Sequence, residues 1–124
     1  MKKTGIAFIL WSFFLLGRSL AETPEAPARV STPDSVAKGQ AVYLRKCFFC
    51  HGEKGDGRGP AAGILNPKPR DFTREEFKYG SSAEAIFKTI ATGVPGTPMG
   101  PFGRQLSEEE IWRLVHFLKS LRAE

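Results

Sequence analysis

The stretch Cys-Phe-Phe-Cys-His, from Cys47 to His51, constrains this chain more than any other feature of its sequence. It contains both cysteines of the chain, separated by two residues and followed directly by a histidine. These residue types at this spacing admit four interpretations. The rest of the sequence bears on the choice among them.

The first 21 residues predict a secretory signal peptide. Lys2 and Lys3 precede an apolar run, and Ala21 supplies the small residue after which cleavage is expected. The apolar run is well short of the ~20 residues that span a bilayer, and Arg18 interrupts it. We therefore expect residues 1–21 to be removed and the remainder to be exported. An uncleaved anchor is the alternative, and contact with a membrane is expected only in that case.

Residues 22–32 are rich in proline and alanine and show no apolar period, which predicts a flexible tether. Residues 33–124 predict a single domain whose core is modest, so a bound cofactor would help to stabilise it. The chain has a formal charge of +5, but three of its cations lie in its first 18 residues. The remainder lacks the dense basic stripe of a nucleic-acid-binding surface, and no nucleic-acid partner is expected.

The sequence predicts three principal helices and no strand. They are expected over residues 33–46, which Thr32 can cap, over residues 82–92, and from Ser107, which can cap the last helix. A short helix is also expected to open over residues 73–76, which read as a capping box. Long loops rich in glycine and proline join these elements, so the predicted fold class is all-α.

Gly39 lies inside the first predicted helix, where glycine costs about 1 kcal/mol relative to alanine. A glycine at such a position indicates the close approach of another backbone. Tyr43 follows one turn later on the same face of the helix.

Three of the four interpretations of Cys47 to His51 fit the rest of the chain poorly. A disulfide between the two cysteines would close a very small loop and would stabilise the fold weakly. A thioredoxin-like redox pair expects a βαβ context, which this sequence lacks. Structural zinc expects four ligands at workable spacings and iron–sulfur clusters expect four thiolates, whereas the chain has two cysteines and two histidines.

The fourth interpretation is the covalent attachment of one haem c group. Cys47 and Cys50 would each form a thioether with a vinyl group of the porphyrin, and His51 would ligate the iron. The spacing is demanding, because both thioethers and the imidazole must match one rigid ring. Export agrees with this interpretation, since the attachment takes place outside the cytoplasm. The sequence favours haem c, and the disulfide is the remaining alternative.

Around this motif, over about residues 34–121, the chain resembles a class I monohaem cytochrome c of the bacterial periplasmic type. Gly39 and Tyr43 precede the motif in the family's pattern of a glycine, three residues and an aromatic. Leu114 and Phe117 correspond to residues that in the family pack against the first helix. The resemblance implies a cytochrome c-like fold, with short helices and long loops wrapped around one covalently bound haem c.

The resemblance also implies how the haem is held. Gly59-Pro60 resembles the family's Gly-Pro, whose proline carbonyl accepts a hydrogen bond from the haem histidine, here His51. The stretch Gly-Thr-Pro-Met ends at Met99, where the family carries its second axial ligand. Met99 is the only methionine beyond the signal peptide, and it lies in a glycine- and proline-rich loop. Ligation by histidine and methionine raises the reduction potential of the iron.

Four further residues have alternative interpretations. His116 is the competing iron ligand, but it is expected to be exposed on the last helix. Arg70 is a candidate donor to a haem propionate, because guanidinium suits carboxylates, and an ordinary surface position is the alternative. Phe48 and Phe49 are large for positions between haem cysteines. We expect one to cover a haem edge and the other to face solvent, with a hydrophobic docking surface as the alternative.

The sequence therefore predicts a periplasmic c-type cytochrome that carries single electrons between redox protein partners and is not itself an enzyme. A haem c subunit of a larger membrane or periplasmic oxidoreductase complex is the alternative. A haem sensor or a weak peroxidase would need an open iron position, which Met99 is expected to fill.

Overall fold

The computed structural model describes residues 29–122, which contain helices and no strand. In chain order these elements are α1 (Pro33–Lys46), α2 (Phe48–His51), the 3-10 helix η1 (Ala62–Ile64), α3 (Ala83–Thr92) and α4 (Glu108–Ser120). The predicted all-α fold is confirmed. The predicted signal peptide, most of the tether and the last two residues of the domain lie outside the described residues.

Helices α1 and α4 begin at the capping residues that the sequence indicates, and α3 begins directly after Ser82. At the start of α1, the amide of Ser35 donates to Oγ1 of Thr32 at 3.1 Å, and the amide of Thr32 donates to Oγ of Ser35 at 2.9 Å. Ser107 and Glu110 form the same reciprocal pair at the start of α4, at 3.2 and 3.0 Å. Ser82 caps α3 by accepting a hydrogen bond at 3.1 Å. These bonds satisfy backbone donors that the first turn of a helix leaves free.

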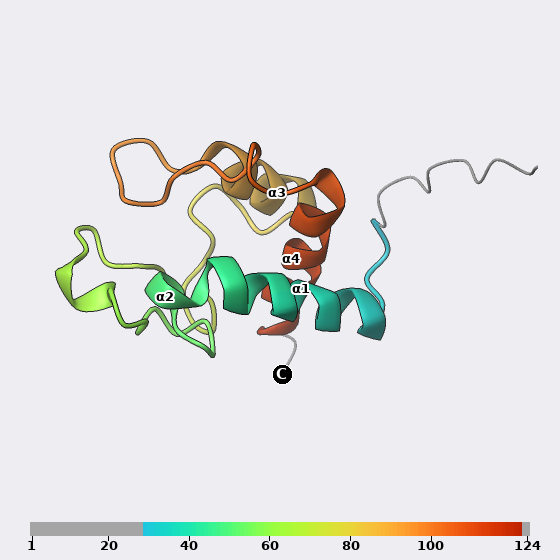
Figure 1. Ribbon diagram of the computed structural model, residues 1–124, viewed down its shortest axis with the longest axis horizontal. Helices are drawn as coiled ribbons and strands as arrows, with labels where there is room; N and C mark the ends of the chain where they lie inside the picture. Colours follow the sequence, from blue (N-terminus) through green and yellow to red (C-terminus); the bar gives the residue numbers. More distant parts are fainter. Residues whose placement is uncertain (1–28, 123–124) are drawn as a thin grey trace, which may run out of the picture.

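Helices α1 and α4 pack against each other and form the centre of the fold (Figure 1). A Cβ atom at Gly39 would lie 2.0 Å from the carbonyl oxygen of Arg113 and 3.0 Å from Cβ of Phe117. Only glycine allows the two backbones to approach so closely. One turn later, the ring of Tyr43 packs on Phe117 with centroids 5.0 Å apart. The predicted close backbone approach at Gly39 is confirmed.

The buried core lies along this pair of helices. Its most deeply buried side chains belong to Tyr43, Leu114 and Val115. Helix α3 joins the core from the side of α4, where the ring of Phe87 lies 4.7 Å from that of Trp112. Among residues 29–122, none of the helices combines the length and apolar character needed to cross a membrane.

The helix predicted over residues 73–76 is wrong, because these residues form a turn and an irregular stretch. The carboxylate of Asp71 takes the capping role and accepts hydrogen bonds from the amide and hydroxyl of Thr73, at 2.9 and 2.5 Å. The carbonyl of Glu76 accepts a hydrogen bond from the guanidinium of Arg70 at 2.5 Å. Side chains therefore take up the backbone groups that a continuing helix would have paired.

The predicted exposure of His116 is also wrong. Its side chain is 4% exposed, and its Nδ1 lies 2.9 Å from Oγ of Ser35, which is 5% exposed. His116 of α4 thus contacts Ser35 in the first turn of α1. The hydrogen bond between them allows the imidazole to be buried. Burial lowers the pKa of His116 below its ordinary value, because it disfavours the charged form.

We predict that Gly39→Ala lowers the free energy of unfolding by about 1–3 kcal/mol, although alanine has the higher helix propensity. The new methyl group would force α1 away from α4. Urea unfolding followed by circular dichroism measures the change. Gly63→Ala is the matched control, because a Cβ atom there meets no atom within 4 Å. Equal unfolding free energies for the two variants would show that the close packing of α1 on α4 at Gly39 does not contribute to stability.

We also predict that stability falls as the pH drops below about 6.5, the ordinary pKa of histidine. The folded pKa of His116 is lowered, so the unfolded chain takes up a proton that the folded protein resists. The stabilisation is complete above the unfolded pKa and is lost as the pH falls toward the folded value. Denaturant unfolding at several pH values measures the slope. His116→Gln should reduce it, and an unchanged slope would show that this histidine is not responsible.

Candidate functional site

A cavity of about 330 Å³ opens among the helices and the long loops, and its volume is typical of a ligand pocket. Four side chains with metal-binding or thiol chemistry lie on its wall: Cys47, Cys50, His51 and Met99. Much of the remaining wall is apolar and includes Leu65, Phe72, Ile86, Ile90, Val94, Phe102, Leu114 and Leu118. The fold therefore brings four predicted site residues together around one largely apolar space.

The two cysteines are placed by the end of α1. Cys47 follows α1 directly, and Cys50 lies in α2, one turn later. Both are half-buried free thiols, so the disulfide of the alternative interpretation is not formed in this structure. Burial raises the pKa of the Cys47 thiol to about 12, so this group is protonated near neutral pH. Two neighbouring free thiols on an apolar wall suit covalent attachment of a large apolar ligand.

The imidazole of His51 is held at its edge and on its face. Its Nδ1 lies 3.2 Å from the backbone oxygen of Arg70, and the ring of Phe72 stacks on it at 4.5 Å between centroids and 23° between planes. A carbonyl partner requires a proton on Nδ1, which leaves Nε2 with the lone pair that a metal needs. Burial also lowers the pKa of His51 and so favours the neutral imidazole.

The carbonyl that pairs with His51 is not the predicted one, because the structure has Arg70 in the place expected for Pro60. Pro60 is exposed and is not part of the cavity wall. The reason lies in the preceding residue. A Cβ atom at Gly59 would lie 2.4 Å from the carbonyl oxygen of Phe49, so this loop runs directly along the backbone of α2. The Gly-Pro pair thus packs the loop against α2, and its proline remains at the surface.

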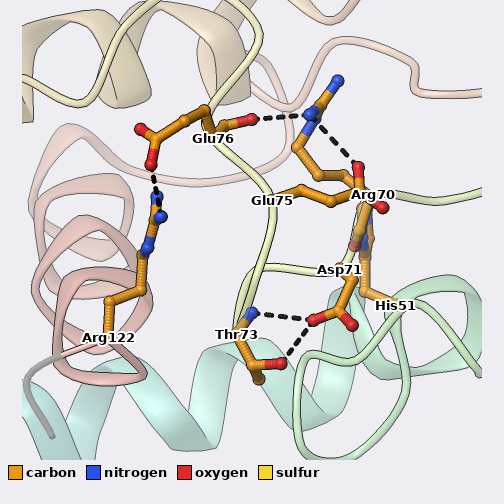
Figure 2. A network of polar contacts seen from close by, with 7 residues as sticks. All are labelled: His51, Arg70, Asp71, Thr73, Glu75, Glu76 and Arg122. Carbon is orange, nitrogen blue, oxygen red and sulfur yellow. Dashed lines mark hydrogen bonds and ion pairs between the residues drawn. The ribbon is translucent and has the colours of Figure 1, made fainter.

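Arg70 also lines the cavity, and its guanidinium turns back toward the following turn (Figure 2). Its Nη1 donates to Oε2 of Glu75 at 3.2 Å and to the backbone oxygen of Glu76 at 2.5 Å. The carboxylate of Glu76 in turn accepts a hydrogen bond from Arg122, just after α4, at 2.6 Å. A chain of polar contacts therefore joins the neighbourhood of His51 to the end of α4.

Met99 lies in a loop that is fixed by its own hydrogen bonds. Its carbonyl accepts a hydrogen bond from the amide of Val94 at 2.9 Å, and its amide donates to Oγ1 of Thr97 at 3.2 Å. At the base of the loop, Gly93 has a φ of +72°, and a Cβ atom there would lie 2.7 Å from the Met99 carbonyl oxygen. The backbone position of Met99 is thus fixed by hydrogen bonds within its own loop.

Three other sequence candidates lie away from the cavity wall. His116 pairs with Ser35 and is not brought to the cysteines. Phe48 and Phe49 are 37% and 59% exposed, and their rings contact each other at 6.3 Å between centroids. Neither phenylalanine belongs to the cavity wall, and both rings are exposed at the surface.

Sequence reasoning missed two contributions to the site. The hydroxyl of Tyr43 donates to the carbonyl of Gly52 at 2.7 Å and so holds the residue that follows His51. Burial raises the pKa of Tyr43, so the hydroxyl stays a donor at any ordinary pH. Phe72, which stacks on His51, lies in a proline-rich stretch that predicted only a loop. Neither contact has a signal in local spacing, because each depends on how a loop folds back.

Known proteins are similar to this chain in sequence. A family model for cytochrome c matches residues 36–122. The chain is 26% identical over 106 residues to a thiosulfate dehydrogenase of Stutzerimonas stutzeri (strain A1501), covering 86% of this chain and 32% of that protein. It is 30% identical over 95 residues to the cbb3-type cytochrome c oxidase subunit FixP of Sinorhizobium medicae (strain WSM419), covering 70% and 30%. The chain thus spans about a third of the length of these relatives.

Solved structures share the fold. A chain of the Kuenenia stuttgartiensis reducing HAO-like protein complex Kustc0457/Kustc0458 matches with a TM-score of 0.72 and 36% identity, over 79% of this chain and 48% of that one. Cytochrome cL from Hyphomicrobium denitrificans has the same fold, with a TM-score of 0.63 and 22% identity, over 85% and 62%. Two thiols, an imidazole and a thioether on one apolar wall also fit a covalent haem. The chain therefore belongs to the cytochrome c family, as a class I monohaem domain that binds haem c covalently.

Proposed function

We propose that this domain transfers single electrons between redox proteins in the periplasm. Cys47 and Cys50 would hold the haem as thioethers, and His51 and Met99 would ligate its iron. The observation that carries the proposal is the presence of all four side chains on one apolar cavity wall. Haem iron, when bound, supplies a one-electron couple whose potential is raised by methionine ligation. The signal-peptide pattern of residues 1–21 supports export.

The residues of the chain bind the ligand, exclude water and keep the ligating side chains in place. The apolar wall from α3 and α4 excludes water from the cavity. Electron exchange would then proceed without a reaction between water and the iron. Among the described residues, the hydrogen-bond partners of the Arg70 guanidinium are on Nη1. We infer that Nη2 is available to donate to a haem propionate, because guanidinium binds carboxylates well.

The first test is the absorption spectrum of the oxidised protein, matured with haem. We expect haem bands together with the weak far-red band of a methionine–iron bond. Met99→Ala should remove the far-red band, lower the reduction potential and allow carbon monoxide to bind.

His116→Gln is the control for this test, because His116 is buried away from the cavity and its replacement should leave the spectrum unchanged. A Met99→Ala variant that kept the parent potential and stayed closed to carbon monoxide would exclude Met99 as the ligand. A matured protein without haem bands would contradict the whole proposal.

The relatives favour a second candidate, in which the domain serves as the haem subunit of a larger oxidoreductase. Two of them are a thiosulfate dehydrogenase and an oxidase subunit, and the chain spans only about a third of each. Under this proposal the domain would pass electrons to or from one bound partner. Affinity purification of the full chain from its own cells should then recover a redox protein in a constant ratio. A monomer that exchanges electrons freely with small carriers would favour the first candidate.

A further inference from the structure

We propose that Glu75 is a positioning residue for His51 and acts through Arg70. Its carboxylate holds the Arg70 guanidinium against the following turn, and the Arg70 carbonyl thereby stays within hydrogen-bond distance of Nδ1 of His51. The inference rests on the proposed ligation of haem iron by His51. It adds a residue that adjusts this ligand from the protein surface.

The Arg70 carbonyl is not placed by regular secondary structure. Arg70 follows Pro67 and Pro69 in an irregular segment, and neither proline can donate a backbone hydrogen bond. Just beyond Arg70, the amide of Phe72 donates to the carbonyl of Gly55 at 2.7 Å. The orientation of the Arg70 peptide therefore depends on its neighbours and on what its own side chain contacts.

The Arg70 side chain joins this peptide to the next turn. One guanidinium nitrogen, Nη1, binds both Oε2 of Glu75 and the backbone oxygen of Glu76, at 3.2 and 2.5 Å. The turn is closed by a hydrogen bond from the amide of Glu75 to the carbonyl of Asp71, at 2.9 Å. The side chain and the turn thus form one closed unit with the Arg70 carbonyl at its beginning. Figure 2 shows the contacts of the guanidinium with Glu75 and Glu76.

The same segment forms an ion pair near the end of α4 and makes a second contact with His51, through the ring of Phe72. Glu76 pairs with Arg122 at 2.6 Å, and the Arg122 guanidinium lies 5.6 Å from the ring centre of Phe77. Phe77 stacks on Phe72 at 5.7 Å and 24°, and Phe72 stacks on His51 at 4.5 Å and 23°. The imidazole is therefore held at Nδ1 by a carbonyl and on its face by a ring, both from one segment.

The bond at Nδ1 affects the metal at the other nitrogen of the ring. A carbonyl acceptor makes the imidazole of His51 a stronger donor through Nε2, and a stronger donor favours the oxidised iron. Loosening the bond should therefore raise the reduction potential. The side chains of Glu75 and Arg70 are 54% and 33% exposed, so their ion pair contributes little to the stability of the whole fold. Its effect is on the local hydrogen bond.

The test compares Glu75→Asp with Glu53→Asp in the haem-loaded protein. Glu75→Asp keeps the charge but shortens the side chain by one methylene group, so Arg70 loses one of its two partners and keeps only the backbone oxygen of Glu76. We expect a higher reduction potential and a roughly two- to tenfold faster exchange of the His51 Nδ1 proton, measured by NMR of the reduced protein. Glu53 is exposed, and its replacement should change neither quantity.

Arg70→Lys provides a second variant, because lysine keeps the charge but its terminal nitrogen is one bond closer to the backbone than Nη1, the atom that binds both oxygens. It should shift the potential and the exchange rate in the same direction, with an unchanged urea midpoint. Parent values for both quantities in Glu75→Asp and Arg70→Lys would overturn the inference alone. A parent protein without an iron-bound histidine would overturn the proposed function as well, and its spectrum and NMR signals reveal this before any variant is compared.

Discussion

The close contact between α1 and α4 at Gly39 sets the relative position of two parts of the cavity wall. The carbonyl oxygen of Arg113 lies 2.0 Å from the position that a Cβ atom of residue 39 would occupy. The two helices are therefore in direct backbone contact. Cys47 continues directly from α1, so the thiols and the histidine that follow are placed by this helix. Leu114 and Leu118 of α4 belong to the same cavity wall. The contact between α1 and α4 thus positions the segment from Cys47 to His51 relative to the apolar residues that α4 contributes to the cavity wall.

The helices could be predicted from the sequence because their signals are local. Thr32, Ser82 and Ser107 each lie three residues from the amide that they cap, and the caps expected at Thr32 and Ser107 are both formed. Two of the failures concern partners that are distant in sequence, whereas the helix expected over residues 73–76 is replaced by a turn with local partners. His116 is buried by a serine 81 residues away, and His51 is paired with a carbonyl 19 residues away. Which residues meet over such distances is decided by the path of the loops, which their composition does not specify.

The candidate site was predictable for a different reason, which is the rarity of its residue types. The chain has two cysteines and two methionines, so a thiol or thioether at a suggestive spacing stands out. It has ten phenylalanines, and nothing in the sequence marks Phe72 as the one that stacks on His51. The same holds for Glu75, whose proposed role depends on one contact with Arg70. Candidate ligands can be picked out by residue type, whereas the residues that contact them are found only by their position in the fold.

The two proposed ligands are held from different helices. The segment around His51 is joined to the end of α4 by the ion pair of Glu76 with Arg122. The loop of Met99 is joined to α3, where the amide of Phe102 donates to the carbonyl of Ile90 at 3.0 Å. A shift of α3 relative to α4 would therefore change the spacing between the ligands. The apolar packing of α3 on α4 opposes such a shift. This packing therefore helps to fix the distance between the two proposed ligands, His51 and Met99.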